Sequence, residues 1–202
     1  MKLRPLALVT ALSLGRLLAD DATDFPPMPP VIPLTAAEEQ KTFQLPPGYR
    51  MELILSEPDI TEPVCMAFDG NGRLYVAEMS SYMKDFDGTD ELVSTGRVSV
   101  HWSSKGDGKY DMHRVFAEKL KLPRLLLPMA DGVLIGETDT NDIYLYKDTN
   151  GDGVSDEKGP VYQGGPRGGN LEHQPFVFVE AAATEIYTAV NNYRLRWKDG
   201  QL

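Results

Sequence analysis

Cysteine is almost absent from this 202-residue sequence, which contains Cys65 and no other. A single cysteine excludes an intrachain disulfide and a Cys-x-x-Cys-His site for covalent haem attachment. Cys65 lies in the apolar run 64–68, which is typical of a strand. We therefore expect a small buried side chain with no chemistry of its own.

Positive charge is also scarce. Lys and Arg number 20 against 30 Asp and Glu, so the net charge is −10. Binding to phosphate backbones requires a basic face, and this composition argues against a nucleic-acid partner. The length is sufficient for one domain with a sizeable core.

The N-terminal run 5–15 is mostly apolar, but it is too short to span a bilayer. Lys2 and Arg4 precede it, and Ala19 offers a small residue for cleavage. This pattern predicts a signal peptide over residues 1–19 and no further transmembrane segment. We expect the mature protein to be secreted or periplasmic.

Residues 20–48 are expected to form a linker and a short helix. The proline-rich stretch 25–33 predicts an extended spacer. Thr35 and Glu38 have the spacing of a capping box, which predicts a helix from there to about Phe43. The run 49–55 has the composition of a first strand.

From residue 49 to 202 the sequence alternates between short strand-like runs and Gly- or Asp-rich turns. Four such runs form a repeat unit. The unit occurs about two and a half times, with boundaries near residues 120 and 170. This predicts an all-β fold, a partial β-propeller of four-stranded blades. Because closed propellers have about four to eight blades, we expect the N-terminal portion of a larger, truncated propeller. The expected strands are 64–68, 73–78, 97–102, 112–117, 124–127, 133–137, 142–147, 160–163, 173–179, 185–190 and 193–197.

The segment 148–156 has the spacing of the first part of an EF-hand-type calcium loop. Position 12 is Gly159 rather than the usual bidentate Glu, and the loop joins two expected strands. Two interpretations are therefore open: a structural Ca²⁺ site, or an Asp/Gly-rich turn whose side chains cap the backbone. The candidate ligands are the side chains of Asp148, Asn150, Asp152 and Asp156 and the carbonyl of Val154.

A degenerate copy of this loop lies 45 residues upstream, over 103–111. It keeps Asp107, Gly108 and Asp111, but Ser103 and Lys105 replace the first and third ligands. We expect this copy to bind no metal. Its spacing is that of a blade repeat, so it supports the propeller prediction.

Several segments resemble a known family: LPPGYRMEL (45–53), PVCMAFDGNGRLYVAEM (63–79), YLYKDTNGDGVSD (144–156) and GGPRGGNLEHQP (164–175). They are similar to the N-terminal propeller of secreted bacterial membrane-bound dehydrogenase-type proteins, the PVC-type haem-binding family. That propeller is distantly similar to soluble quinoprotein glucose and sorbosone dehydrogenases. The sequence departs from the family pattern over 176–184.

The resemblance implies a quinone-dependent dehydrogenase that oxidises a sugar or alcohol with pyrroloquinoline quinone. It implies catalytic roles for His173, as general base, and Glu172, which orients it. Arg167 would bind a carboxylate of the quinone. In full-length members a cytochrome-type domain accepts the electrons. The alternative for His173 is a hydrogen bond within its loop, and for Arg167 a place in a plain connection between blades.

The remaining polar residues point to no separate site. His101 and His113 flank the degenerate loop without a set of other ligands, and we expect structural roles for them. Asp85, Asp87 and Asp90 lie in an insertion, 79–95, that reads as a solvated acidic loop. Two functions stay open: the quinone-dependent dehydrogenase, and a non-enzymatic calcium-stapled propeller that binds carbohydrate or a protein partner.

Overall fold

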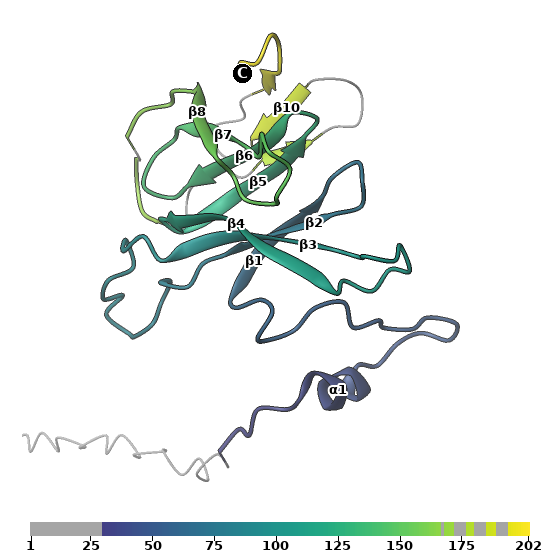
Figure 1. The fold of residues 1–202 in the computed structure, drawn as a ribbon. Helices are drawn as coiled ribbons and strands as arrows, with labels where there is room; N and C mark the ends of the chain where they lie inside the picture. The colour runs from purple at the N-terminus through teal and green to yellow at the C-terminus, as the bar shows by residue number, and fades with distance from the viewer. Residues whose placement is uncertain (1–29, 167, 172–176, 180–184, 189–193) are drawn as a thin grey trace, which may run out of the picture.

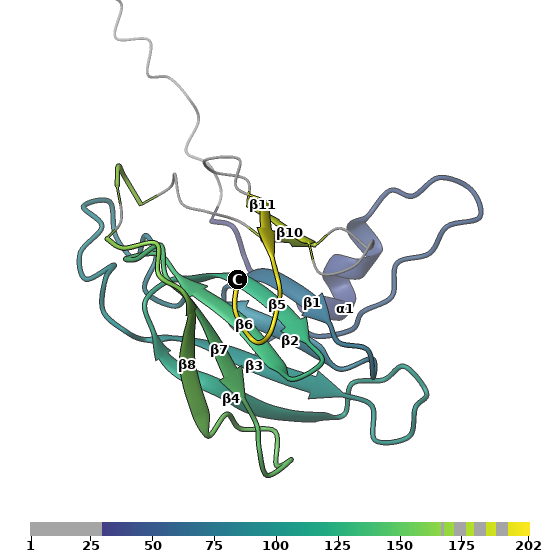
Figure 2. The ribbon, with the colours of Figure 1, turned by 90° about the horizontal axis from the view of Figure 1, so that it is seen from above.

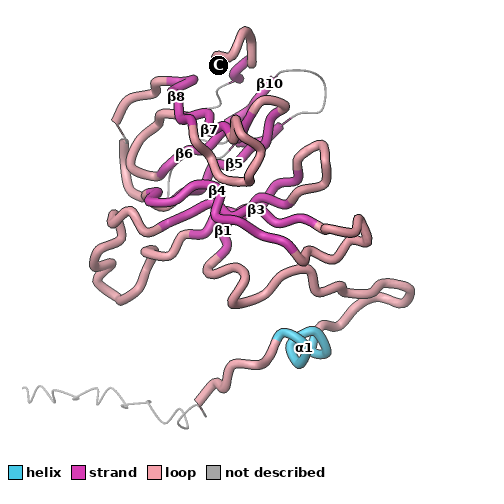
Figure 3. The backbone as a smooth tube through the Cα atoms, viewed as in Figure 1, coloured by secondary structure: helices cyan, strands magenta, loops and turns pink. Residues whose placement is uncertain are grey.

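The computed structural model describes residues 30–166, 168–171, 177–179, 185–188 and 194–202. The predicted signal peptide and the candidate residues Arg167, Glu172 and His173 lie outside the described residues. The described chain consists of a short helix followed by three antiparallel sheets (Figures 1 and 3). No helix among the described residues is long and apolar enough to cross a membrane.

The predicted capping box is confirmed. Thr35 is the N-cap of α1 (Ala36–Glu39), and the 3₁₀ helix η1 (Gln40–Thr42) continues it. The Glu38 N–H donates to Thr35 Oγ1 at 3.3 Å, and the Thr35 N–H donates to the Glu38 carboxylate at 2.9 Å. The helix buries no residue, and it lies beyond the first sheet on the side away from the second (Figure 1).

The first sheet contains β1 (Pro63–Phe68), β2 (Leu74–Glu78), β3 (Gly96–Trp102) and β4 (Met112–Leu120), hydrogen-bonded in that order. Asp69 fixes the β1–β2 turn, because its Oδ1 accepts from the N–H groups of Asn71 and Arg73, each at 2.9 Å. Gly72 has a φ of 79°, a conformation that side chains other than Gly rarely adopt.

The second sheet repeats the first, with β5 (Pro123–Met129), β6 (Gly132–Glu137), β7 (Ile143–Lys147) and β8 (Glu157–Tyr162) in sequence order. The third contains β9 (Val177–Val179), β10 (Glu185–Thr188) and β11 (Arg194–Arg196). The sheet boundaries therefore fall close to the predicted positions, and the order of strands within each sheet is that of a propeller blade.

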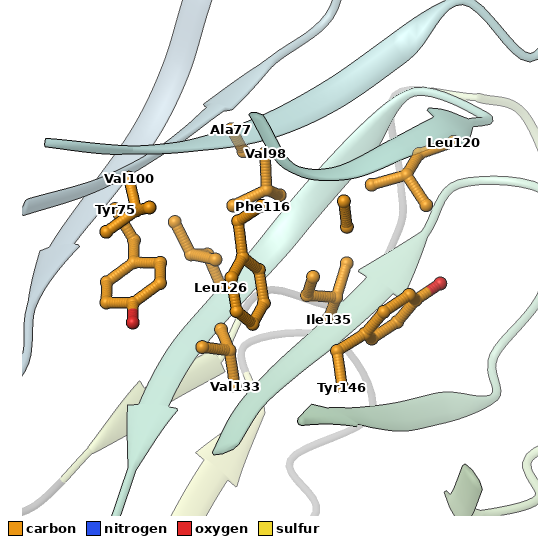
Figure 4. Close-up of a cluster of buried hydrophobic side chains, with 11 residues drawn as sticks. Tyr75, Ala77, Val98, Val100, Phe116, Leu120, Leu126, Val133, Ile135 and Tyr146 are labelled. Carbon is orange, nitrogen blue, oxygen red and sulfur yellow. The ribbon is translucent and has the colours of Figure 1, made fainter. Parts of the chain in front are cut away.

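The three sheets stack face to face, as Figures 1 and 2 show. Between the first and second lies a cluster of buried side chains in which Tyr75 and Phe116 meet edge to face, 5.3 Å apart (Figure 4). A second cluster, including Leu134, Ile143 and Ile186, joins the second sheet to the third. The first strands of the sheets, β1, β5 and β9, contact one another in succession. The fold is thus a partial all-β propeller.

The predicted first strand is wrong. Residues 49–55 form no strand in the described chain, and residues 49–54 are exposed. A strand needs a hydrogen-bonded neighbour, and none of the described strands pairs with this segment. Cys65 is half-buried, and its thiol donates to the Arg124 carbonyl oxygen at 3.4 Å.

Candidate functional site

The loops gather at two opposite ends of the sheet stack, because consecutive strands are antiparallel. The crossover end contains the β2–β3 insertion, the β6–β7 loop and the connections between sheets, at residues 79–95, 121–122, 138–142, 163–166 and 168–171. The hairpin end contains residues 69–73, 103–111, 130–131 and 148–156. In the sequence, Arg167, Glu172 and His173 fall between β8 and β9, outside the described residues.

The described part of the β8–β9 connection is anchored to the β6–β7 loop. The Asn141 N–H donates to the Gly165 carbonyl at 2.9 Å, and Asn141 Nδ2 donates to the Pro166 carbonyl at 2.9 Å. In return the Gly165 N–H donates to Asp142 Oδ1 at 2.9 Å. A Cβ on Gly164 would lie 2.6 Å from the Asn141 carbonyl oxygen, so this close approach requires glycine. Apart from turn composition, no sequence pattern indicated that residues 140–142 anchor this connection.

The described Lys side chains at the crossover end are paired with acids. Lys121 Nζ lies 2.8 Å from Asp139 Oδ2, and this hydrogen bond raises the pKa of Lys121. Lys84 Nζ lies 2.9 Å from Glu62 Oε1. The insertion contributes exposed carboxylates at Asp85, Asp87 and Asp90. The described surface at this end is therefore predominantly acidic.

A buried Arg lies below these loops. Arg124 is in β5, and its Nε donates to Thr138 Oγ1 at 2.9 Å. Thr138 in turn donates to the Leu122 carbonyl at 2.7 Å. Both side chains are buried, so the connection between the first and second sheets is fixed to the β6–β7 loop from inside.

The sequence did not reveal a buried polar network in the first sheet. Glu78 Oε2 accepts from Arg97 Nη2 at 2.7 Å and from the Thr61 N–H at 2.8 Å. Its Oε1 accepts from Ser99 Oγ at 2.7 Å, and Ser99 Oγ lies 2.9 Å from His101 Nε2. Side chains alternate along β3, so residues 97, 99 and 101 lie on one face of the sheet. This alternation of polar residues is the sequence pattern that could have predicted the network.

His101 and His113 are cross-strand neighbours whose rings stack 5.9 Å apart. Burial lowers the pKa of His101, and the nearby His113 lowers it further. Because the Nε2 of His101 is directed to Ser99, the residue is part of the sheet interior. Its predicted structural role fits this placement.

The insertion 79–95 is held by its own hydrogen bonds. Ser81 Oγ donates to the Glu91 carbonyl at 2.8 Å, and the Thr89 N–H donates to Asp85 Oδ1 at 2.9 Å. Hydrogen bonding to Thr89 lowers the pKa of Asp85, which therefore stays ionised. Phe86 is 97% exposed at the tip of this loop.

The predicted calcium loop caps its own backbone. Asp148 Oδ1 accepts from the Gly151 N–H at 2.7 Å, and its Oδ2 accepts from the Gly153 N–H at 2.8 Å. Asn150 Oδ1 accepts from the Asp152 N–H at 2.9 Å, and Asp152 Oδ1 accepts from the Val154 N–H at 2.8 Å. In the part of the chain that the structure describes, no group of three or more His, Cys, Asp or Glu residues could hold a metal ion. Calcium binding stays a prediction.

The loop 148–156 and its upstream copy share one hydrogen-bond pattern. The Thr149 N–H and Oγ1 donate to the Asp156 carboxylate at 3.1 and 2.8 Å. The Ser104 N–H and Oγ donate to Asp111 in the same way, at 2.7 and 2.6 Å. These bonds lower the pKa of both carboxyls. The residue at the ninth position, Asp156 or Asp111, therefore closes each loop. This holds even for the upstream copy, in which two of the candidate ligands are replaced.

A cleft of about 300 Å³ lies at the hairpin end, between the first two sheets. It is on the opposite side of the stack from the β8–β9 connection. Within it Arg73 Nε and Asp69 Oδ2 form an ion pair at 2.6 Å. Its lining comprises Asp69, Arg73, Tyr75, Phe116, Pro128, Met129, Ala130, Asp131, Gly132, Val133, Asp148 and Gly151.

Comparison with known proteins yields one family and one fold. A family model described as "Domain of unknown function (DUF7133)" matches residues 35–200. Among curated proteins, none matches the sequence. A solved structure, the holo form of the pyranose dehydrogenase PQQ domain from Coprinopsis cinerea, superposes with a TM-score of 0.50 at 12% identity. The match covers 72% of this chain and 31% of that one. The predicted distant similarity to quinoprotein dehydrogenases is thus confirmed at the level of the fold.

Proposed function

The chain belongs to the DUF7133 family, and from this premise we propose that it contributes the propeller of a secreted or periplasmic quinone-dependent sugar or alcohol dehydrogenase. The observation that carries the proposal is the stack of sheets, which has the fold of a PQQ domain. The crossover end is the proposed reaction site, because the β8–β9 connection contains the acid–histidine pair Glu172-His173. In full-length relatives a cytochrome-type partner would receive the electrons.

His173 is the proposed general base. The chemistry that pyrroloquinoline quinone would supply, when bound, is a two-electron acceptor for the hydride of the substrate carbon. His173 takes the proton of the substrate hydroxyl, so the alcohol becomes a carbonyl. A neutral imidazole suits this step because its ordinary pKa lies near the working pH. Glu172 orients the ring and stabilises the imidazolium that forms.

The described residues support the proposal by fixing the start of the connection whose sequence contains this pair. Asn141 and Asp142 fix Gly165 and Pro166 by three hydrogen bonds of 2.9 Å, immediately before residue 167. Lys84 and Lys121 are already ion-paired. We therefore assign the quinone carboxylates to Arg167. The exposed carboxylates of the insertion disfavour anionic substrates, which supports a neutral sugar or alcohol.

Calcium, where it binds, is a structural ion in this proposal. The loop 148–156 lies at the hairpin end, and the β8–β9 connection lies at the opposite end of the same sheet. In this proposal an ion there lies at the opposite end from the reaction site, so it does not polarise the substrate. Its proposed role is to stabilise the β7–β8 loop, which the Ser155 N–H joins to the Phe116 carbonyl of β4 at 2.8 Å.

The test combines quinone binding with turnover. Equilibrium dialysis with pyrroloquinoline quinone and dye-linked oxidation of a panel of sugars and alcohols are measured with Ca²⁺ present. We expect both from a closed propeller ring, in which further sheets complete the three described ones, and no turnover from residues 1–202 alone, because a partial ring cannot enclose the cofactor. A closed ring that binds no quinone would overturn the proposal. Glycan or protein binding by that ring would then favour the non-enzymatic binding propeller.

A further inference from the structure

The cleft of about 300 Å³ at the hairpin end lies between the first and second sheets, opposite the proposed reaction site. The dehydrogenase proposed above makes no use of it. We propose that this cleft binds a small polyhydroxylated cation, of the chemical class of amino sugars. The inference does not rest on the proposed function, because the residues that carry it lie at the other end of the sheets.

The cleft is built from three loops and two buried strand residues. The β1–β2 turn, the β5–β6 hairpin and the β7–β8 loop each contribute to its lining. Tyr75 of β2 and Phe116 of β4 line it from inside, and their ring centroids are 5.3 Å apart. A volume of this size is at the lower end of the range of small-molecule sites, about 300–1,000 Å³. The cleft therefore fits one small molecule.

The Tyr75 hydroxyl has no hydrogen-bond partner among the described residues. Tyr75 is only 3% exposed, and it lines the cleft. Figure 4 shows its hydroxyl pointing away from the centre of the buried cluster. Buried Tyr hydroxyls usually find a partner, because they have lost their bonds to water. Burial also raises the pKa of Tyr75, so the hydroxyl stays protonated and can both donate to a ligand oxygen and accept from a ligand hydroxyl.

Arg73 offers further donors beside the Tyr75 ring. Its Nε donates to Asp69 Oδ2 at 2.6 Å, and its backbone N–H donates to Asp69 Oδ1 at 2.9 Å. The guanidinium carbon lies 5.8 Å from the centre of the Tyr75 ring. The two terminal nitrogens, Nη1 and Nη2, donate to no described residue. Because Asp69 already holds the guanidinium in place, these nitrogens can bind ligand oxygens at little further cost in ordering.

Acidic groups outnumber basic ones around the cleft. Its described lining contains three carboxylates, those of Asp69, Asp131 and Asp148, against the guanidinium of Arg73. The excess of negative charge repels anions and favours a cation. A metal ion does not fit this description, because no group of three or more His, Cys, Asp or Glu among the described residues could hold one. The favoured ligand is therefore an organic cation.

Asp131 is the carboxylate best placed to receive the positive charge of the ligand. It is exposed at the tip of the β5–β6 hairpin, and no ion pair joins it to a described residue. The side chain of Lys147 passes close to Gly132, but its ammonium lies 3.9 Å from Glu157 Oε1. An ammonium group of the ligand can therefore pair with Asp131.

The remaining groups match a ring that bears several hydroxyls. A hydroxyl donates one hydrogen bond and accepts others, so it can bridge the acceptors of the carboxylates and the donors of Arg73. Tyr75 can serve either role. Pro128 and Met129 are half-buried in the lining and offer apolar surface to the C–H groups of such a ring. An amino sugar has the hydroxyls, the apolar ring face and the ammonium together.

A charge series of three sugars tests the proposal. Ligand-observed NMR titrations of the purified chain use D-glucosamine, D-glucose and D-glucuronate near neutral pH, where the amine of glucosamine is protonated. EDTA is present, so that no Ca²⁺ engages Asp148. We expect glucosamine to bind about fivefold more tightly than glucose at low salt, the upper end for an exposed ion pair, and glucuronate not to bind. Added salt should reduce the preference for glucosamine.

Two conservative variants separate the parts of the site. Tyr75→Phe keeps the ring and removes the hydroxyl, so the affinity for glucosamine and for glucose should fall by about 10-fold. Asp131→Asn removes only the charge, so the two sugars should bind equally, with the affinity for glucose unchanged. The matched controls are Tyr144→Phe and Asp87→Asn, which make the same changes outside the cleft and should bind as the wild type does. Circular dichroism checks the fold of each variant.

A chain that binds none of the three sugars would overturn the proposal. Equal affinity of the wild type for glucosamine and glucose, or binding of glucuronate, would overturn the assignment of a cation. Full affinity in Tyr75→Phe, or an unchanged preference for glucosamine in Asp131→Asn, would show that the sugars bind elsewhere. The titrations contain no quinone, so none of these results bears on the proposed dehydrogenase.

Discussion

Asp156 accepts two hydrogen bonds from Thr149, one from the backbone N–H at 3.1 Å and one from Oγ1 at 2.8 Å. The pair closes the β7–β8 loop through hydrogen bonds within the chain. Asp156 is therefore needed for the loop conformation, whether or not it is also a calcium ligand. Asp148 and Asp152 are better tests of metal binding, because they occupy the first and fifth positions of the calcium pattern.

Calorimetric titration separates the two interpretations of this loop. We expect one Ca²⁺ per chain in the wild type and none in the double variant Asp148→Ala, Asp152→Ala. Thr149→Ala should retain calcium binding and lose about 1 kcal/mol of unfolding free energy, the usual contribution of such a hydrogen bond. Absence of calcium heat in the wild type would establish a plain Asp/Gly turn.

The ion pair of Glu78 with Arg97 should be important for stability. Glu78→Gln removes the charge that Arg97, Ser99 and the Thr61 N–H all face. We expect denaturant unfolding to show a loss of about 3 kcal/mol, the lower end for a broken buried pair, because Arg97 remains 35% exposed. Glu118→Gln is the control, since the Glu118–Lys119 pair is exposed and should contribute less than about 0.5 kcal/mol.

Acid should destabilise the fold through His101. Burial lowers its pKa below the ordinary value of 6.5, so below pH 6.5 the unfolded chain binds a proton that the folded chain does not. This contribution to stability is complete above pH 6.5 and is lost as the pH falls from there toward the lowered pKa. Denaturation midpoints between pH 5 and 8 should show this slope, and His101→Gln should flatten it. An unchanged slope in the variant would assign the effect to other groups.

The thiol of Cys65 should react slowly. Burial raises its pKa to about 11 from 9.0. Near pH 8 the folded chain then contains about 100-fold less thiolate than the unfolded chain, and alkylation by iodoacetamide should slow by at least that factor. Mass spectrometry with and without denaturant measures the ratio. Equal rates would show that the strand β1 opens readily.

The features that were predicted correctly from the sequence depend on residues close together along the chain. The capping box at Thr35 and the turn at Asp69 are local patterns, and the structure contains both. The Glu78 network was missed because it joins β2, β3 and the arm before β1, which only the fold brings together. The strand at 49–55 was predicted from local composition, but a strand also needs a hydrogen-bonded neighbour, and no described strand pairs with this segment. The catalytic roles proposed for Glu172 and His173 stay predictions, because both residues lie outside the described chain.

The last prediction concerns His173. If it is the general base, His173→Ala in the closed ring should lower kcat by ~10²–10⁴-fold, the usual contribution of a positioned base, and leave quinone affinity nearly unchanged. Glu172→Gln should lower kcat less, because that residue orients the ring. His113→Ala is the matched control: His113 lies in β4 next to the hairpin end, so its loss should leave turnover unaffected. Full activity of the His173→Ala ring would contradict the general-base role and favour the binding propeller.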